Sequence, residues 1–99
     1  MAKIKIESKD VTEIKSALET KKLILGTERV LKELKRGNLS KIFLSSNCPE
    51  NIMDDINYYV SLNEIQVISL DMHNEDLGIV CKKPFAVSVL GFMKWLYEN

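Results

Sequence analysis

The sequence has 99 residues, of which 45% are hydrophobic and 28% are charged. This length fits a single domain over residues 1–99, and the composition is that of a soluble globular protein rather than a disordered or fibrous one. Lysine and arginine number 14, as do aspartate and glutamate. The formal charge is therefore zero, which excludes a uniformly basic protein that coats nucleic acid but leaves room for a local basic patch.

Membrane insertion, export and metal binding find no support in the sequence. The longest nearly apolar stretch, residues 85–93, is too short for a bilayer span, which needs about 20 residues. The N-terminal residues lack the apolar core of a signal peptide, so we expect a cytoplasmic protein without a membrane partner. Cys48 and Cys81 are too few for a disulfide scaffold. Together with the single histidine, they cannot form a familiar structural zinc site, and we expect no cofactor.

Helix-like and strand-like segments alternate along the chain. In chain order the pattern predicts a helix over 11–20, a strand over 23–25, a helix from Thr27 to Gly37, a strand over 41–45, a helix from Pro49 to about Leu62, a strand over 66–70, a short helix over 74–80, a strand over 87–90 and a final short helix over 92–97. Apolar strands between amphipathic helices predict a sheet covered on both faces. The expected fold is an α/β, three-layer α/β/α sandwich with a small four-stranded mixed sheet, in which ligands meet the loops beyond the strand carboxyl ends.

Charge is segregated along this neutral chain. Residues 21–41 contain seven lysines and arginines but two glutamates, whereas residues 42–81 contain seven acidic residues and no lysine or arginine. On charge alone, an ordinary solvated helix face explains the basic segment better than a ligand site does. Glu28 and Lys32 form a favourable i,i+4 pair on such a face.

The first candidate site lies where the first strand turns into a helix. Gly26 lets another backbone approach closely, and the start of the helix offers unpaired N–H groups to an anion. Thr27 can cap the helix or donate to a phosphate. The segment lacks the pattern of an NTPase phosphate loop, and a single glycine before a helix is usually only a tight turn.

Two further loops contain residues suited to RNA. Asn47 can present both a donor and an acceptor to a base edge, although a cap or a turn is the commoner use of asparagine. It lies near Gly26 if the first two strands are parallel neighbours. Lys82 and Lys83 precede Phe85, which can stack on an unpaired base while the cations hold phosphates. The alternative is that Phe85 fills the edge of the core.

An enzymatic site finds no support. His73 has no Ser or Cys partner at a diagnostic spacing. The adjacent acidic pairs at 54–55 and 75–76 fall on predicted helices, where neighbouring side chains diverge by about 100 degrees and cannot form a carboxylate dyad. Cys48 is better explained as a small buried residue than as a reactive thiol.

Five segments occur together in an order that matches a known family. They are Leu25–Lys32 (LGTERVLK), Ser45–Pro49 (SSNCP), Ile56–Tyr59 (INYY), Leu77-Gly78 and Pro84–Leu90 (PFAVSVL). Together they resemble the archaeal-type L-thirty-e family of large-subunit ribosomal proteins. That family belongs to the superfamily of kink-turn RNA-binding proteins that also includes L-seven-Ae. The resemblance covers about residues 10 to 92.

The resemblance implies a non-catalytic protein of the large ribosomal subunit that recognises and stabilises a kink-turn, a sharply bent helix–internal loop–helix element, in ribosomal RNA. It also implies a ribosomal, cytoplasmic location, no small-molecule substrate and a monomer when free. RNA is held by three loops at one end of the sheet. On this chain they contain Gly26, Thr27, Glu28, Arg29 and Lys32; Asn47, Cys48 and Pro49; and Lys82, Lys83, Phe85, Ala86 and Val87.

The resemblance also suggests roles for these residues. Glu28 would accept hydrogen bonds from guanine, and Arg29 and Lys32 would face guanine acceptors or phosphates. Asn47 would read a base edge, and Phe85 would pack with Val87 under an unstacked nucleotide.

One position departs from the family pattern. The second residue after the glycine is commonly Lys or Asn in the family, whereas here it is Glu28. With the acidic region 54–76, this motivates an alternative: a specialised paralogue of the same fold that acts as a protein-interaction or regulatory module with weak or no RNA binding.

Overall fold

The structure, a computed structural model, describes residues 9–20, 22–62 and 65–94. In these ranges the chain forms α1 (Lys9–Thr20), β1 (Leu23–Leu25), α2 (Thr27–Lys35), β2 (Leu39–Leu44), α3 (Glu50–Ser61), β3 (Gln66–Ser69), α4 (Asn74–Val80) and β4 (Val89–Met93). No helix in this part of the chain has the length and apolar content to cross a membrane.

The four strands form one mixed sheet with the order β1-β4-β2-β3. Strand β4 runs antiparallel to both β1 and β2, whereas β2 and β3 are parallel. Leu90 of β4 lies between Leu25 of β1 and Phe43 of β2. The expected four-stranded mixed sheet is confirmed, and its central pair is formed by β2 and β4.

The prediction of a final helix over 92–97 is wrong for the residues of this segment that the structure describes. Phe92 and Met93 belong to β4, which begins at Val89, and residues 95–97 lie outside the described ranges. Phe92 pairs with both Leu23 and Lys41. Because β4 is central and all five of its residues are buried, its sequence lacks the alternation that marks a strand with one solvated face.

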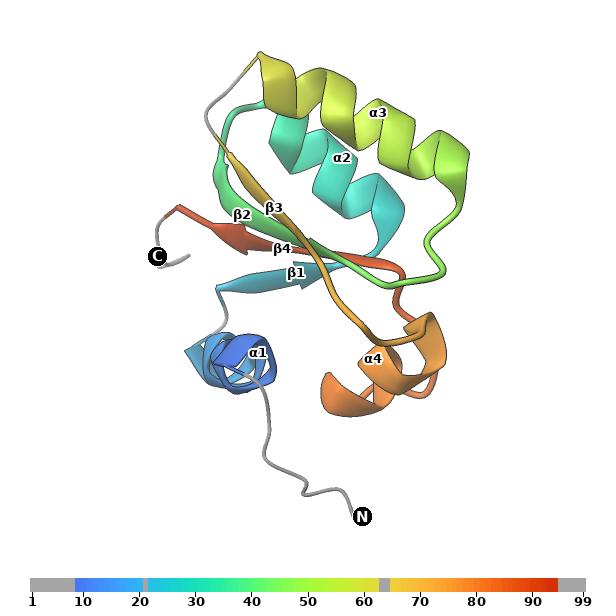
Figure 1. Ribbon diagram of the computed structural model, residues 1–99. Helices are drawn as coiled ribbons and strands as arrows, with labels where there is room; N and C mark the ends of the chain where they lie inside the picture. Colours follow the sequence, from blue (N-terminus) through green and yellow to red (C-terminus); the bar gives the residue numbers. More distant parts are fainter. Residues whose placement is uncertain (1–8, 21, 63–64, 95–99) are drawn as a thin grey trace.

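Helices cover both faces of the sheet (Figure 1). Helices α2 and α3 pack on one face, and α1 and α4 lie on the other. The core under α2 and α3 is formed by Ile24, Val30, Leu34, Leu39, Ile42, Leu44, Cys48, Ile56, Ile65, Val89 and Met93. The core under α1 and α4 is formed by Ile14, Ala17, Phe43, Leu70, Leu77, Cys81, Val87, Leu90 and Phe92. The two clusters confirm the three-layer α/β/α sandwich.

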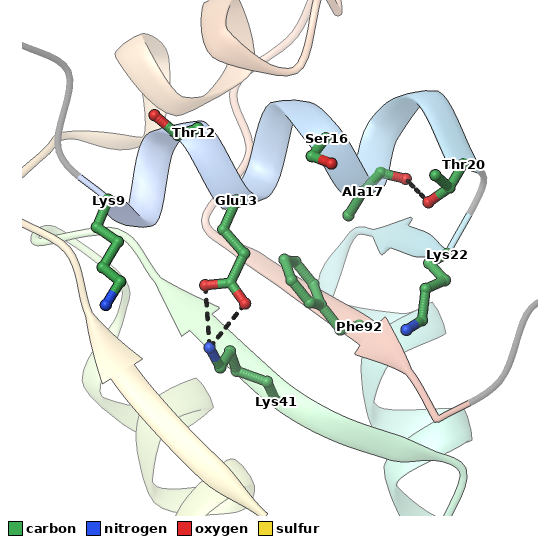
Figure 2. A pocket seen from close by; sticks show the side chains of 9 residues that line it. All are labelled: Lys9, Thr12, Glu13, Ser16, Ala17, Thr20, Lys22, Lys41 and Phe92. Atoms are coloured by element: carbon green, nitrogen blue, oxygen red, sulfur yellow. Dashed lines mark hydrogen bonds and ion pairs between the residues drawn. The ribbon is translucent and has the colours of Figure 1, made fainter.

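An ion pair ties α1 to the sheet. Figure 2 shows Lys41 of β2 reaching Glu13 of α1, with 2.9 and 3.0 Å between the Nζ atom and the two carboxylate oxygens. The same Nζ lies 5.6 Å from the ring centroid of Phe43 and 6.0 Å from that of Phe92. The pair lines an open hollow of about 850 Å³ between α1 and the sheet. Lys41 therefore satisfies its charge at the edge of the apolar layer.

We expect Glu13→Gln to lower the free energy of unfolding by about 0.5–1 kcal/mol, because Lys41 would lose its carboxylate partner beside the aromatic rings. Urea denaturation at low and high salt measures this loss, which salt should shrink. Glu19→Gln on the exposed part of α1 is the control for charge and helix propensity. Equal losses in both variants would contradict a specific pair.

Candidate nucleic-acid interface

The topology gathers several loops at one edge of the sheet (Figure 1). The carboxyl ends of β1, β2 and β3 and the amino end of β4 lie at this edge, because β4 is antiparallel to its neighbours. We call it the rim; it comprises residues 26–32 and the loops 45–49, 70–73 and 81–88. We expected Asn47 to lie near Gly26 if β1 and β2 were parallel neighbours. They are not neighbours, because β4 lies between them. They nevertheless point the same way, so Gly26 and Asn47 follow strand ends at the same edge.

Main-chain hydrogen bonds join the rim to β4. Gly26 N–H donates to the Val89 carbonyl oxygen at 3.1 Å, and Ser45 N–H donates to the Ser88 carbonyl oxygen at 2.9 Å. The segment that enters β4 thus binds the turn after β1 on one side and the loop after β2 on the other. The three predicted loops are therefore connected rather than scattered over the surface.

A pair of asparagines connects three of the rim loops. The Asn47 Oδ1 atom accepts from the main-chain N–H of Asn74, the first residue of α4, at 2.8 Å, and Asn47 Nδ2 lies 3.3 Å from Asn74 Oδ1. Asn74 Nδ2 in turn donates to Ser88 Oγ at 3.1 Å, and the Asn74 carbonyl oxygen accepts from Val87 N–H at 3.0 Å. Asn47 therefore caps a helix that begins 27 residues later, and its side chain is already oriented by the fold.

The start of α2 is open to a ligand. Gly26 is the N-cap residue with φ 99°, and no side-chain hydrogen bond caps the helix. A Cβ at this position would have open space around it, so the positive φ rather than crowding favours glycine. Thr27 is the first helical residue, and the expectation that its hydroxyl caps the helix is wrong. The first N–H groups of α2 consequently remain available to an anion.

Charged side chains of α2 stand beside this helix start. Glu28, Arg29 and Lys32 are exposed, whereas Val30 and Leu34 are fully buried and hold the helix on the sheet. Glu28 and Lys32, with Leu31, Lys35 and Arg36, line a shallow hollow of about 400 Å³. The acid at position 28 therefore lies among cations, which partly offset its charge.

The loop that leads into β4 packs closely on α4. A Cβ on Gly78 would overlap the carbonyl oxygen of Phe85, so glycine is required where loop and helix meet. Lys83 N–H donates to the Gly78 carbonyl oxygen at 2.9 Å, and Lys82 turns the chain with φ 60°. Phe85 is 56% exposed, so it does not fill the edge of the core. Ala86 is also exposed. The loop therefore presents to solvent an aromatic ring that follows two exposed lysines in the sequence.

Two residues of the predicted site are buried. Cys48 is 7% exposed under α2 and α3, and Val87 is 2% exposed under α1 and α4. Burial also raises the pKa of the Cys48 thiol, so it stays neutral at physiological pH. Because the Val87 side chain is buried, the expectation that it contacts a nucleotide is wrong. Both residues instead anchor their loops in the two cores. Pro49 is exposed and serves as the N-cap residue of α3.

Sequence reasoning missed three residues of the rim region. Asn74 and Ser88 complete the hydrogen-bond network, but their partners are distant in sequence, so no local pattern marks them. Ile79 is 71% exposed. The exposure of Ile79 could have been predicted from the sequence. Leu77 is buried in α4, and a residue two positions further along a helix points to another side.

The residues described carry no group of three or more histidine, cysteine or acidic side chains able to hold a metal ion. The rim instead combines exposed cations, an open helix start and an exposed aromatic ring. In an α/β/α protein, a loop surface of this kind has groups suited to unpaired or bent RNA, since cations hold phosphates and rings stack on bases.

Comparison with known proteins assigns the family. Residues 9–94 match the model of the Ribosomal protein L7Ae/L30e/S12e/Gadd45 family. The chain is 40% identical over 77 residues to large ribosomal subunit protein eL30 of Methanothermobacter thermautotrophicus, covering 78% of this chain and 79% of that protein. It is 38% identical over 85 residues to eL30 of Methanocaldococcus jannaschii, covering 85% and 77%. The chain belongs to the L7Ae/L30e/S12e/Gadd45 family, which confirms the resemblance.

Solved structures share the fold. A Bacillus halodurans protein of unknown function has a TM-score of 0.78 and 22% identity, covering 87% of this chain and 85% of that chain. A Giardia lamblia 15.5kD RNA binding protein has a TM-score of 0.71 and 13% identity, covering 93% and 81%. At these identities the likeness concerns the three-layer architecture alone.

We expect Asn74→Ala to lower the free energy of unfolding by about 1 kcal/mol, because Ser88 Oγ loses its donor and Asn47 Nδ2 loses its acceptor, whereas the main-chain hydrogen bonds of residue 74 remain. Chemical denaturation measures the loss. Ser46→Ala, in the same exposed loop as Asn47, is the control and should change stability little. A neutral Asn74→Ala would show that the side-chain hydrogen bonds of Asn74 do not help to hold the loops together.

Proposed function

We propose that this protein is a non-catalytic, RNA-binding component of the large ribosomal subunit in the cytoplasm, that it acts as a single domain and is a monomer when free. We further propose that its rim recognises a kink-turn in ribosomal RNA. Family membership and the similarity to archaeal eL30 proteins support the ribosomal assignment.

The observation that supports the kink-turn proposal is that three loops, far apart in the sequence, lie together at the rim. Gly26 is bonded to β4, Asn47 to α4, and the Phe85 loop packs on Gly78. A bent RNA exposes two arms and an unstacked loop at the same place, and only a surface of several fixed loops meets them together. The rim binds this conformation better than the extended one, and it thereby stabilises the bend.

Each part of the rim would meet a different chemical group. The open start of α2 and the Arg29 and Lys32 side chains hold phosphates or guanine acceptors. Glu28 accepts from guanine N–H groups. Phe85 stacks on an unpaired base while Lys82 and its neighbouring lysine attract the backbone.

We expect Lys32→Ala and Phe85→Ala each to weaken binding of a kink-turn RNA by about 1–3 kcal/mol without unfolding the protein. A gel-shift assay measures affinity, and thermal unfolding checks the fold. Lys22→Ala is the control, because Lys22 precedes β1 and lines the hollow beside α1 (Figure 2), whereas the rim lies beyond the carboxyl end of that strand. Equal affinity of wild type and both rim variants would remove the proposed site.

Glu28 gives a second test of the same surface. We expect Glu28→Lys to weaken binding of a kink-turn RNA about threefold to tenfold while it steepens the salt dependence by about one counterion, because a cation near phosphate cannot replace a carboxylate that accepts from guanine N–H groups. Glu19→Lys makes the same charge change on α1, away from the rim. Tighter binding by the Glu28 variant would show that the carboxylate makes no base-specific contact and acts on the RNA through its charge alone.

The alternative is a protein-interaction or regulatory member of the family with little RNA affinity. The exposed carboxylate of Glu28 at the rim is the observation that favours it. Nanomolar binding of a kink-turn RNA in moderate salt supports the ribosomal function, whereas no binding at micromolar protein supports this alternative.

A further inference from the structure

Exposed apolar residues occur in two places on the described surface. Ile79 and Phe85 are at or beside the rim and fit the function proposed above. Tyr58 is 61% exposed and Leu62 is 64% exposed, and neither belongs to the rim. They are four residues apart at the end of α3, so they project from the same side of the helix. An exposed aromatic and an exposed leucine side by side form an unpartnered apolar surface.

This surface is continuous with acidic residues. Asp54 and Asp55 are both exposed and lie one turn before Tyr58. In the described residues, neither aspartate takes part in an ion pair. Helix α3 contains no lysine or arginine, and neither does any other part of residues 42–81. We call Asp54, Asp55, Tyr58 and Leu62 the α3 stripe.

The tyrosine of the α3 stripe is supported from below. Its ring packs edge-on against Tyr59, with 5.0 Å between centroids and 81° between planes. Tyr59 is half-buried against the core, and Lys35 Nζ of α2 lies 5.4 Å from its ring centroid. The Tyr58 ring is therefore partly ordered before any partner arrives, which lowers the entropy lost on binding.

We propose that the α3 stripe docks a cationic segment of another protein, in which lysine or arginine side chains alternate with aliphatic ones. The two carboxylates repel phosphate and attract cations, which favours a basic protein over RNA. The exposed tyrosine face accepts a cation, and Leu62 packs against aliphatic side chains. Because α3 begins at the rim and the α3 stripe extends from the middle of the helix to its far end, the segment and an RNA on the rim can bind together.

The test uses the full chain and two defined probes. The first is a 16-residue peptide, longer than the α3 stripe in either an extended or a helical conformation, in which Lys and Arg alternate with Leu and Ala. The second replaces every Lys and Arg with Glu. Amide NMR spectra of the labelled protein should shift at residues 54–62 on adding the basic peptide and not the acidic one. Shifts centred on another surface, or equal shifts with both peptides, would overturn the proposal.

Charge specificity is tested with matched pairs of substitutions. The double variant Asp54→Asn, Asp55→Asn should weaken binding of the basic peptide by about fivefold. Glu75→Gln, Asp76→Asn on α4 changes the net charge equally and should leave affinity unchanged. Equal weakening in both double variants would mean that only overall charge matters, which would overturn the docking site.

The apolar part is tested with Tyr58→Ala, which should weaken binding about tenfold while thermal unfolding stays close to wild type. Leu62→Ala, at an exposed position just beyond the helix, gives a second reading if the first variant unfolds. Unchanged affinity in both would overturn the proposal.

A final titration separates this inference from the RNA function. The peptide is added to the protein already saturated with a kink-turn RNA, and a ternary complex is expected. Displacement of the RNA would show one shared surface and overturn a separate docking site. The peptide experiments use the free protein, so their outcome does not depend on whether the protein binds RNA. Self-association that rises with concentration and requires Tyr58 would overturn the proposal, because the α3 stripe would then bind a second copy of the chain.

Discussion

The antiparallel course of β4 between β1 and β2 is the constraint on which the rim depends. Two strands that are both antiparallel to a third must point the same way, so the turn after β1 and the loop after β2 emerge at one edge. The loop that enters β4 arrives between them. Hydrogen bonds from Gly26 and Ser45 to this segment then fix their spacing. The proposed binding surface is thus a consequence of strand order, and the side chains of the loops are added to a geometry already determined.

Charge follows the same division of the molecule. Although the net charge of the chain is zero, exposed Arg29, Lys32, Lys82 and Lys83 lie at the rim, whereas the charged residues of α3 are all acidic. Because α2 and α3 lie side by side on one face (Figure 1), a cationic and an anionic surface adjoin. Such an arrangement orients the protein in an RNA-rich environment, since one side is attracted to phosphate and the other is repelled.

The local pattern of apolar and polar residues was enough to predict most of the elements and the layers, because buried strands and amphipathic helices are recognisable from a few consecutive residues. It failed where partners are distant. Phe92 was assigned to a helix because a short central strand that is buried on both faces has no period of its own. The role of Asn47 as a cap for α4 depends on a residue 27 positions away, and the burial of Val87 depends on how its loop crosses the helix at Gly78. The family resemblance located the loops but not these contacts.

Strand β4 is also the last part of the sheet to be synthesised. Without residues 89–93, β1 has no partner in the described sheet, and β2 and β3 form only a two-stranded pair. An isolated pair of strands is at best marginally stable in water. Both cores therefore remain open until β4 has emerged from the ribosome, so the residues synthesised before it cannot complete this fold by themselves.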